Sequence, residues 1–321
     1  MNILITGGGG FLGFRLAKTL LARGKLAGKP VSRVTLLDGA FPAGVEKLQK
    51  VTAVTGDVSD GKTIASVCTP DTDAVFHLAA VVSGAAEADF DLGMRVNLKG
   101  MELLLAQMRK CAKPPRLVYT SSVAAFGGEL PAVLDDSTIA NPQTSYGAQK
   151  VIGEYLVTDY SRKGFLDGRS LRLPTIVVRA GKPNAAASSF ASAVIREPLN
   201  GVAYDCPVAP ETGVWLLSPG KVVEAFIHAW ELPAEAWGAQ RWLNLPGITA
   251  SVAQMVEAMR KVAGDAAAQR VRYKDDARIQ AIVKTWPVNF RTPRALAMGF
   301  KPDADVESVI RAYIADEKIR I

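Results

Sequence analysis

Apolar and polar residues follow one another along the first half of the chain in a pattern that predicts alternating strands and helices. Short apolar-rich runs occupy residues 2–5, 33–38, 49–55, 74–80 and 116–122. Runs of this length that end at Gly, Asp or Ser are typical of strands. Residues 14–23 instead carry apolar side chains three and four positions apart, which indicates an amphipathic helix. Strands that alternate with helices predict an α/β fold with a parallel, doubly wound sheet.

A cluster of glycines joins the first predicted strand to the first predicted helix. Residues 6–13 read Thr-Gly-Gly-Gly-Gly-Phe-Leu-Gly. In this context Gly7 permits a tight turn, Gly10 leaves room for a pyrophosphate, and Gly13 lets the helix lie close to the sheet. The N–H groups at the start of the helix then face phosphate oxygens. Such a loop can also be a plain turn, and the flanking strand and helix favour a dinucleotide site.

An acidic residue ends the second predicted strand. Asp38 stands where a dinucleotide fold accepts hydrogen bonds from the adenosine ribose, and it is followed by Gly39 rather than Arg. A carboxylate there repels a 2′-phosphate, so the sequence favours NAD over NADP. The alternative is a solvated aspartate in a turn.

The third and fourth predicted strands end in small or polar residues. Asp57 follows Gly56 and can meet the adenine amino group or cap the next helix. The fourth strand is apolar almost throughout, which is typical of a fully buried strand, and its last residues Ala79 and Ala80 leave space for a flat cofactor. His77 in the same strand is interpreted as a hydrogen-bonded core residue rather than a base.

Hydroxyl groups end the fifth predicted strand and a tyrosine–lysine pair follows it. Ser121 and Ser122 stand at the carboxyl end of that strand, where open α/β sheets place their ligands. Tyr146 and Lys150 are four residues apart on a predicted helix and therefore share one face. A nearby ammonium stabilises a phenolate, which a tyrosine needs if it is to act as a base near neutral pH. A tyrosine–lysine pair alone is common by chance, and its place behind a dinucleotide loop and a Ser-Ser strand end makes it far more specific.

Composition narrows the class of protein. The chain has 321 residues, of which 49% are hydrophobic and 21% charged, and its formal net charge is +7. The basic residues are spread along the chain, so we expect no nucleic-acid partner, although they can help to attract an anionic substrate. Three scattered cysteines and two histidines give no disulfide framework and no metal site. The first strand leaves no space for a signal peptide and no run is long enough to cross a membrane, so we expect a cytoplasmic protein.

These motifs together resemble the extended short-chain dehydrogenases/reductases, the family of the nucleotide-sugar epimerases and dehydratases. The resemblance implies that Tyr146 is the catalytic acid/base, that Lys150 lowers its pKa and binds the nicotinamide ribose, and that Ser122 holds the reacting oxygen. Asn97 would support the geometry of the active-site helix. The cofactor is implied to be NAD, contacted by Gly7, Gly10, Phe11, Leu12, Gly13, Asp38, Asp57, Val58, Leu78, Ala79, Ala80, Asn97, Ser121, Tyr146, Lys150, Leu173 and Pro174.

The second half of the chain resembles the D-erythronate 2-dehydrogenases, a branch of that family that acts on short sugar acids. Residues 180–199 carry this likeness, with Ala180 where a proline is expected in the branch. Arg196 would then form a bidentate pair with a substrate carboxylate, and the alternative for it is an ion pair on the surface or between domains. The resemblance implies that the substrate contacts Ser83, Ser122, Tyr146, Thr175, Lys182, Ser188, Ser189 and Arg196.

The sequence thus predicts a Rossmann-type NAD-binding domain at residues 1–178 and a smaller α/β substrate lobe at residues 179–321 that folds back in part onto the first domain. A sixth strand is expected at residues 171–179, a core helix at 222–230, a helix capped by Ser251, and a terminal helix at 306–314.

We expect an NAD-dependent enzyme that oxidises the C2 hydroxyl of a small anionic sugar acid, with D-erythronate favoured. The alternatives are a nucleotide-sugar epimerase or dehydratase that recycles NAD, and a non-catalytic protein that senses NAD. The helices that carry Asn97 and Tyr146 are apolar enough to pair in a homodimer, as the family resemblance suggests, or to be buried within the monomer.

Overall fold

A computed structural model describes residues 1–181 and 188–321. These residues form two compact units that interleave along the chain. The first unit comprises Met1–Ala125, Thr144–Arg172 and Val223–Leu243. The second comprises Phe126–Gln143, Leu173–Val222 and Asn244–Ile321.

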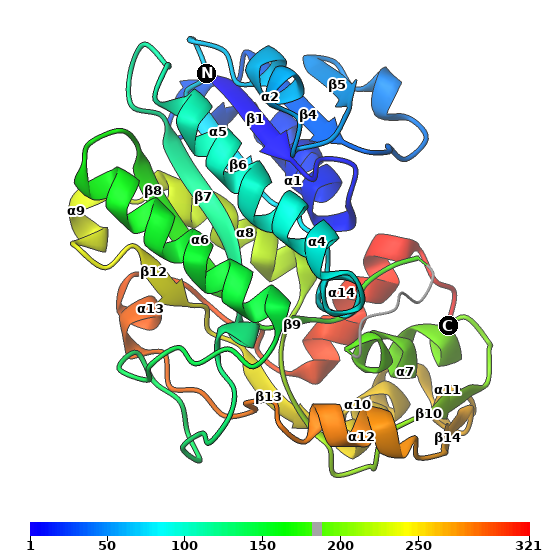
Figure 1. Cartoon of the computed structure of the whole chain (residues 1–321). Coiled ribbons are helices and arrows are strands. Elements are labelled where there is room, and N and C mark those ends of the chain that lie inside the picture. Colours follow the sequence, from blue (N-terminus) through cyan, green and yellow to red (C-terminus); the bar gives the residue numbers. More distant parts are fainter. Residues whose placement is uncertain (182–187) are drawn as a thin grey trace. The chain divides into compact units, whose positions relative to one another are not determined.

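A seven-stranded sheet organises the first unit (Figure 1). Its strands in spatial order are β12 (Trp242–Asn244), β8 (Asp167–Leu173), β7 (Arg116–Ser122), β6 (Ala74–His77), β1 (Asn2–Thr6), β4 (Arg33–Asp38) and β5 (Val51–Thr55). The pairs from β5 to β7 are all parallel. The carboxyl ends of these five strands therefore lie at one edge, and the chain order reverses between β1 and β6, where α/β sheets bind ligands. The expected Rossmann-type sheet is confirmed.

Helices cover both faces of this sheet because successive strand residues point to opposite sides. On one face α2 (Gly61–Val67), α5 (Gly100–Met108) and α6 (Ser145–Arg162) bury a core that includes Leu4 and Leu117. Figure 1 shows α5 and α6 running beside each other over the strands. Ile3 and Ile5 point to the other face, where α1 (Phe11–Arg23) packs on β1. The remaining elements of this unit are β2 (Lys25–Leu26), β3 (Lys29–Pro30), α3 (Ser83–Ala88), α4 (Phe90–Gly93), a π-helical segment (Met94–Lys99), most of α8 (Pro219–Glu231), α9 (Ala234–Trp237) and three-residue 3₁₀ helices at Val45–Lys47 and Val123–Ala125.

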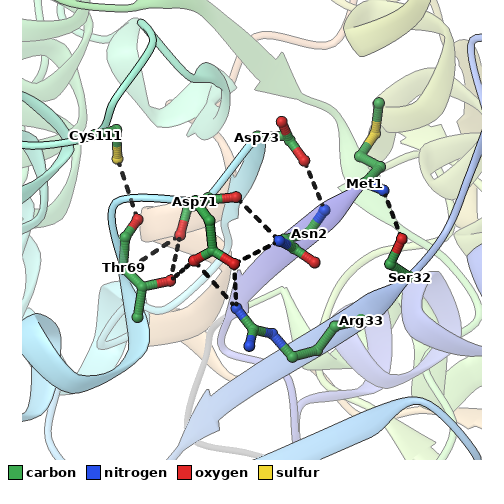
Figure 2. A network of polar contacts seen from close by, with 9 residues as sticks. Met1, Asn2, Ser32, Arg33, Thr69, Asp71, Asp73 and Cys111 are labelled. Carbon is green, nitrogen blue, oxygen red and sulfur yellow. Dashed lines mark hydrogen bonds and ion pairs between the residues drawn. The ribbon is translucent and has the colours of Figure 1, made fainter.

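A polar network ties down the amino ends of the central strands (Figure 2). The Asn2 N–H donates to Asp73 and its side-chain amide donates to Asp71. Asp71 also accepts from Arg33 and Thr69. The hydrogen bond from Thr69 is the main cause of the lowered pKa of Asp71. This network lies at the opposite edge of the sheet from the strand ends that carry the predicted site.

The second unit has its own sheets and core. Its three-stranded sheet has the order β13 (Ile248–Ser251), β11 (Gly213–Leu217) and β9 (Thr175–Ile176), with β11 antiparallel to β13 and parallel to β9. Helices α7 (Ser189–Leu199), α10 (Val252–Ala263) and α14 (Val306–Glu317) pack together around an apolar cluster. The remaining elements are β10 (Tyr204–Cys206) paired with β14 (Val271–Tyr273), and the short helices α11 (Asp265–Ala268), α12 (Ala277–Val283) and α13 (Pro293–Ala297).

The expected sixth strand at 171–179 is wrong in its bounds. The structure has β8 ending at Leu173 and a separate strand β9 at Thr175–Ile176 that pairs with β11. Pro174 separates the two, because proline has no N–H to donate to a sheet ladder. The fourth strand also ends early, at His77, and the next three residues lie beside the glycine loop.

The two units differ from the single expected division at residue 178 in three segments, and one of these, 173–178, belongs to the second unit. Residues 223–243 belong to the first unit because β12 extends the main sheet beside β8, and residues 126–143 belong to the second.

Three expected helices are confirmed. The core helix appears as α8, Ser251 caps α10 in a reciprocal capping box with Gln254, and the terminal helix is α14. Among the residues that the structure describes, none of the helices has the length and hydropathy needed to span a bilayer.

Candidate active site

The glycine loop lies between β1 and α1, and its conformation requires glycine. Gly7 has φ +71°, and a Cβ on it would lie 2.7 Å from the backbone nitrogen of Ala79. A Cβ on Gly13 would lie 2.1 Å from the carbonyl oxygen of Gly7. Gly10 is the N-cap of α1, and no side chain caps this helix start. The start of α1 is therefore left for an external anion.

Asp38 and Asp57 end neighbouring strands near this loop. The Asp38 carboxylate accepts a hydrogen bond from the Gly9 N–H at 2.9 Å, so it lies directly beside the glycine loop. Asp57 accepts from Ser59 and from Arg95 at 2.5 Å, and its hydrogen bonds to Ser59 are the largest cause of its lowered pKa. The expectation that Asp57 caps the next helix is wrong, because Asp60 accepts from the first N–H groups of α2.

His77 is a core residue, as expected. Its ring is buried, shares a 2.6 Å hydrogen bond with Thr6 and stacks on Tyr119. Burial, aided by the charge of Lys150, lowers the pKa of His77 to about 3, so the ring is neutral at physiological pH. The residues that follow it, Leu78 to Ala80, run past the glycine loop, because Leu78 N–H donates to the Thr6 carbonyl at 3.0 Å.

Ser122, Tyr146 and Lys150 all belong to the first unit. Ser122 ends β7 and its Oγ accepts a hydrogen bond from Ala124 N–H at 3.1 Å. Thr144 caps α6 by accepting from Gly147 N–H, which places half-buried Tyr146 in the first turn and Lys150 one turn later. The carboxyl end of β7 lies at the same edge of the sheet as the glycine loop, because β1, β6 and β7 are parallel.

The ammonium of Lys150 lies between two tyrosine rings. It is 5.5 Å from the ring centroid of Tyr146 and 4.9 Å from that of Tyr119, and it donates to the Thr120 carbonyl at 2.8 Å. The side chain is almost fully buried, and this desolvation lowers the pKa of Lys150 to about 7 against the opposing charge of Glu154. A cation held beside a phenol in this way can stabilise a phenolate and hold its ring in position.

Asn97 ties the π-helical segment to α6. Its side-chain oxygen accepts from Val81 N–H at 2.8 Å, and its amide donates to Gln149 at 2.7 Å. Gln149 is the residue before Lys150 on α6, and the supporting role of Asn97 stays a prediction.

Most of the predicted substrate residues belong to the second unit. Thr175 lies in β9, Ser188 precedes α7, and Ser189 and Arg196 lie on α7. The guanidinium of Arg196 is buried, forms a 2.7 Å ion pair with Glu197 and donates to the Arg179 carbonyl. Arg196 is therefore in an ion pair, but with its neighbour on α7 rather than on the surface or between domains, and its role in substrate binding stays a prediction. Lys182 lies outside the described residues, and Ser83 begins α3 in the first unit.

The sequence analysis missed several polar residues around the predicted site. Glu154 and Arg172 form a buried ion pair on α6 and β8, and Ser121 donates to Glu154. In the second unit, Arg179 donates to Ser188 at 3.0 Å. Glu154 lies four residues after Lys150 on one helix face, which is the signal that could have found it.

A large cavity in the second unit lies apart from the predicted site residues. Within residues 1–181 and 188–321, no cluster of three or more His, Cys, Asp or Glu side chains could hold a metal ion. The cavity has a volume of about 1000 Å³ and is lined by Trp215, Phe290 and Leu296 among others. None of the predicted site residues lines it.

The sheet, the glycine loop and the Ser–Tyr–Lys group define a Rossmann-type dinucleotide-binding protein of the short-chain dehydrogenase kind. The profile of the NAD dependent epimerase/dehydratase family matches residues 3–232. The chain belongs to this family.

Several relatives match the chain from end to end. It is 57% identical over 320 residues to a D-erythronate dehydrogenase of Cupriavidus necator, which covers 98% of both chains. It is 43% identical to a D-erythronate dehydrogenase of Haemophilus influenzae over 98% of this chain and 99% of the relative. A solved structure described as a nucleoside-diphosphate-sugar epimerase from Agrobacterium tumefaciens is 41% identical, has a TM-score of 0.92 and covers 99% of this chain and 94% of that one.

Proposed function

We propose that this protein is an NAD-dependent dehydrogenase that oxidises the C2 hydroxyl of a short sugar acid, with D-erythronate as the favoured substrate. The observation that carries the reaction type is the buried Lys150 ammonium fixed between Thr120 and the ring of Tyr146. The names of the relatives from Cupriavidus necator and Haemophilus influenzae support the substrate.

The residues of this chain fit the parts of such a reaction. The Tyr146 phenolate takes the proton of the C2 hydroxyl, Ser122 donates a hydrogen bond to the reacting oxygen, and Lys150 stabilises the phenolate. Bound NAD supplies the hydride acceptor. The protein contributes the orientation of the reacting groups and the charge of Lys150. The Thr144 cap fixes the start of α6, and the hydrogen bond to Thr120 fixes the Lys150 ammonium.

The residues beside the glycine loop fit NAD. The start of α1 has no side-chain cap and can receive the pyrophosphate, with Phe11, Leu12 and Gly13 in its first turn. Asp38, fixed by the Gly9 N–H, would accept the ribose hydroxyls and repel a 2′-phosphate. We propose further cofactor contacts at Val58, which follows β5, and at Ala79 and Ala80, which follow β6.

One assay tests this function. We expect purified protein to form NADH from NAD with four-carbon aldonates, to react best with D-erythronate, and to be much slower with NADP. Absorbance at about 340 nm measures the reduced form of either cofactor, NADH or NADPH. A lack of NADH with every aldonate would overturn the proposal.

A nucleotide-sugar epimerase is the second candidate, favoured by the name of the similar Agrobacterium tumefaciens protein. The same residues would serve an epimerase, which recycles its NAD. UDP-sugars tested beside the aldonates separate the two candidates, because an epimerase converts the sugar without net formation of NADH.

A non-catalytic NAD sensor is the third candidate, and it has no need for Ser122, Tyr146 and Lys150 together. Binding of NAD without turnover of either substrate class would favour it.

We also propose that the chain forms a homodimer through α6, which carries Tyr146, and the helical stretch that carries Asn97 and begins with α4. Helices α4 and α6 pack on each other and expose large apolar side chains, with Phe90 58%, Ile152 40% and Tyr155 68% exposed. Such exposure on neighbouring helices is typical of an interaction surface.

Charges on this surface should separate the subunits. We expect light scattering to give the double variant Ile152→Glu with Tyr155→Glu the molar mass of a monomer, 34.2 kDa. The wild type should show twice that mass. Ile139→Glu is the control, because Ile139 is 84% exposed and lies outside these helices. A wild type that is already monomeric would contradict the proposal.

A further inference from the structure

A buried ion pair lies one turn beyond Lys150 on the same helix. Glu154 and Arg172 are each about 2% exposed and form two parallel hydrogen bonds of 2.8 and 2.7 Å. Ser121 of β7 donates to the same carboxylate at 2.5 Å. The Arg172 guanidinium also stacks on Trp242, 3.9 Å from the ring centroid. The carboxylate is therefore fixed by residues of two strands, β7 and β8, and Trp242 of β12 packs on the arginine that holds it.

Ordinary stability does not account for this arrangement. Burial of two charges carries a desolvation penalty that their attraction often fails to offset, so an apolar pair of similar volume would serve the core equally well. The Glu154 carboxylate lies on the face of α6 that carries Lys150, because residues four apart on a helix are neighbours.

The other groups around Lys150 do not supply a negative charge. His77 of β6 is buried and neutral, and burial holds the pKa of Tyr119 of β7 well above its usual value. Thr120 offers a neutral carbonyl. The carboxylate of Glu87 on α3 is exposed to solvent and accepts a hydrogen bond from Ser145 N–H at the start of α6 instead of lying beside the buried lysine.

We propose that Glu154 is a positioning residue for the reaction: its carboxylate, locked to β8 by Arg172, keeps Lys150 in its charged form beside Tyr146. This inference rests on the proposed dehydrogenase function. Desolvation pushes the lysine toward its neutral form, and the charge of Glu154 opposes that tendency. Without the carboxylate, Lys150 would lose its proton at lower pH and the Tyr146 phenolate would lose its cation.

The decisive variants remove the carboxylate without leaving the buried arginine charge uncompensated. Glu154→Gln alone deprives Arg172 of the carboxylate that neutralises it, which can prevent folding. The double variant Glu154→Gln with Arg172→Met removes both charges at similar volume. We expect the alkaline-rising limb of kcat/KM to shift upward by up to about one pH unit in the double variant, because Lys150 loses an adjacent opposite charge and the simultaneous loss of the Arg172 charge offsets part of that effect.

A direct titration gives a readout apart from turnover. NMR of protein labelled at the lysine side chains, with the Lys150 signal identified by its absence in Lys150→Met, should show Lys150 deprotonating at lower pH in the double variant. Glu154→Asp keeps a carboxylate and should lie closer to the wild type.

A matched control separates charge from structural damage. Asp167→Asn with Arg169→Met removes the ion pair between Asp167 and the fully buried Arg169 at the amino end of β8, together with the ion pairs from Arg116 and Arg241 to Asp167. It should lower stability without moving the Lys150 titration. An unchanged titration and an unchanged limb in the folded Glu154 double variant would overturn the inference. If the wild type oxidises no aldonate, the function proposal fails, and the titration still decides the role of Glu154.

Discussion

Replacement of Tyr146 by Phe should lower kcat on the order of 1000-fold while NAD binding stays within about twofold of the wild type. A positioned acid or base contributes roughly 10²–10⁴ in rate, and the phenol oxygen is the proposed base. The ring itself should remain in place, because Thr144 still caps α6 and Lys150 still donates to Thr120. Steady-state kinetics with D-erythronate and calorimetric titration of NAD measure the two effects.

Tyr160→Phe is the control for this prediction. Tyr160 lies on the same helix and makes an edge contact with Phe165 that a phenylalanine keeps. It should turn over at the wild-type rate. Residual turnover of Tyr146→Phe within tenfold of the wild type would contradict the role assigned to Tyr146.

The local parts of the fold could be predicted because neighbouring residues determine them. The bounds of β4 and β7 follow from apolar runs that end in Asp38 and Ser122. The cap of α10 follows from Ser251 and Gln254, three residues apart. The glycine loop could be placed because strand, glycines and helix are consecutive in the sequence.

Features that depend on distant pairing could not be predicted in the same way. The addition of β12 to the main sheet depends on its pairing beside β8, and nothing in the local pattern of residues 242–244 specifies that partner. The break at Pro174 was visible in the sequence, but the pairing of β9 with β11 was not.

The candidate site shows the same division between local and distant information. The spacing of Tyr146 and Lys150 is a property of one helix, so it was accessible from the sequence. The charge that acts on Lys150 is set by Glu154, whose orientation depends on Arg172 of β8. Arg196 could not be assigned from its residue type, because its ion pair with Glu197 is a matter of side-chain geometry.

Replacement of Gly13 by Ala should weaken NAD binding by roughly ten- to a hundredfold. The added Cβ would lie 2.1 Å from the Gly7 carbonyl oxygen and 2.9 Å from the Cα of Gly8, so the loop or the start of α1 must shift. Such overpacking costs about 1–3 kcal/mol, and each 1.4 kcal/mol lost from binding is a factor of about ten. The clashing atoms are backbone atoms of the loop that would hold the pyrophosphate, so we expect much of the strain to appear in NAD affinity.

Calorimetric titration with NAD measures how far the strain weakens NAD binding. Thermal unfolding of the NAD-free protein measures how far it lowers the stability of the fold. Gly61→Ala is the matched control, because Gly61 also lies in the first turn of a helix and its Cβ would meet nothing closer than Leu103 at 3.7 Å. It should bind NAD as the wild type does. Wild-type affinity in Gly13→Ala would show that the close approach of α1 to Gly7 is not needed to hold the cofactor, and the glycine loop would then lose its assigned role.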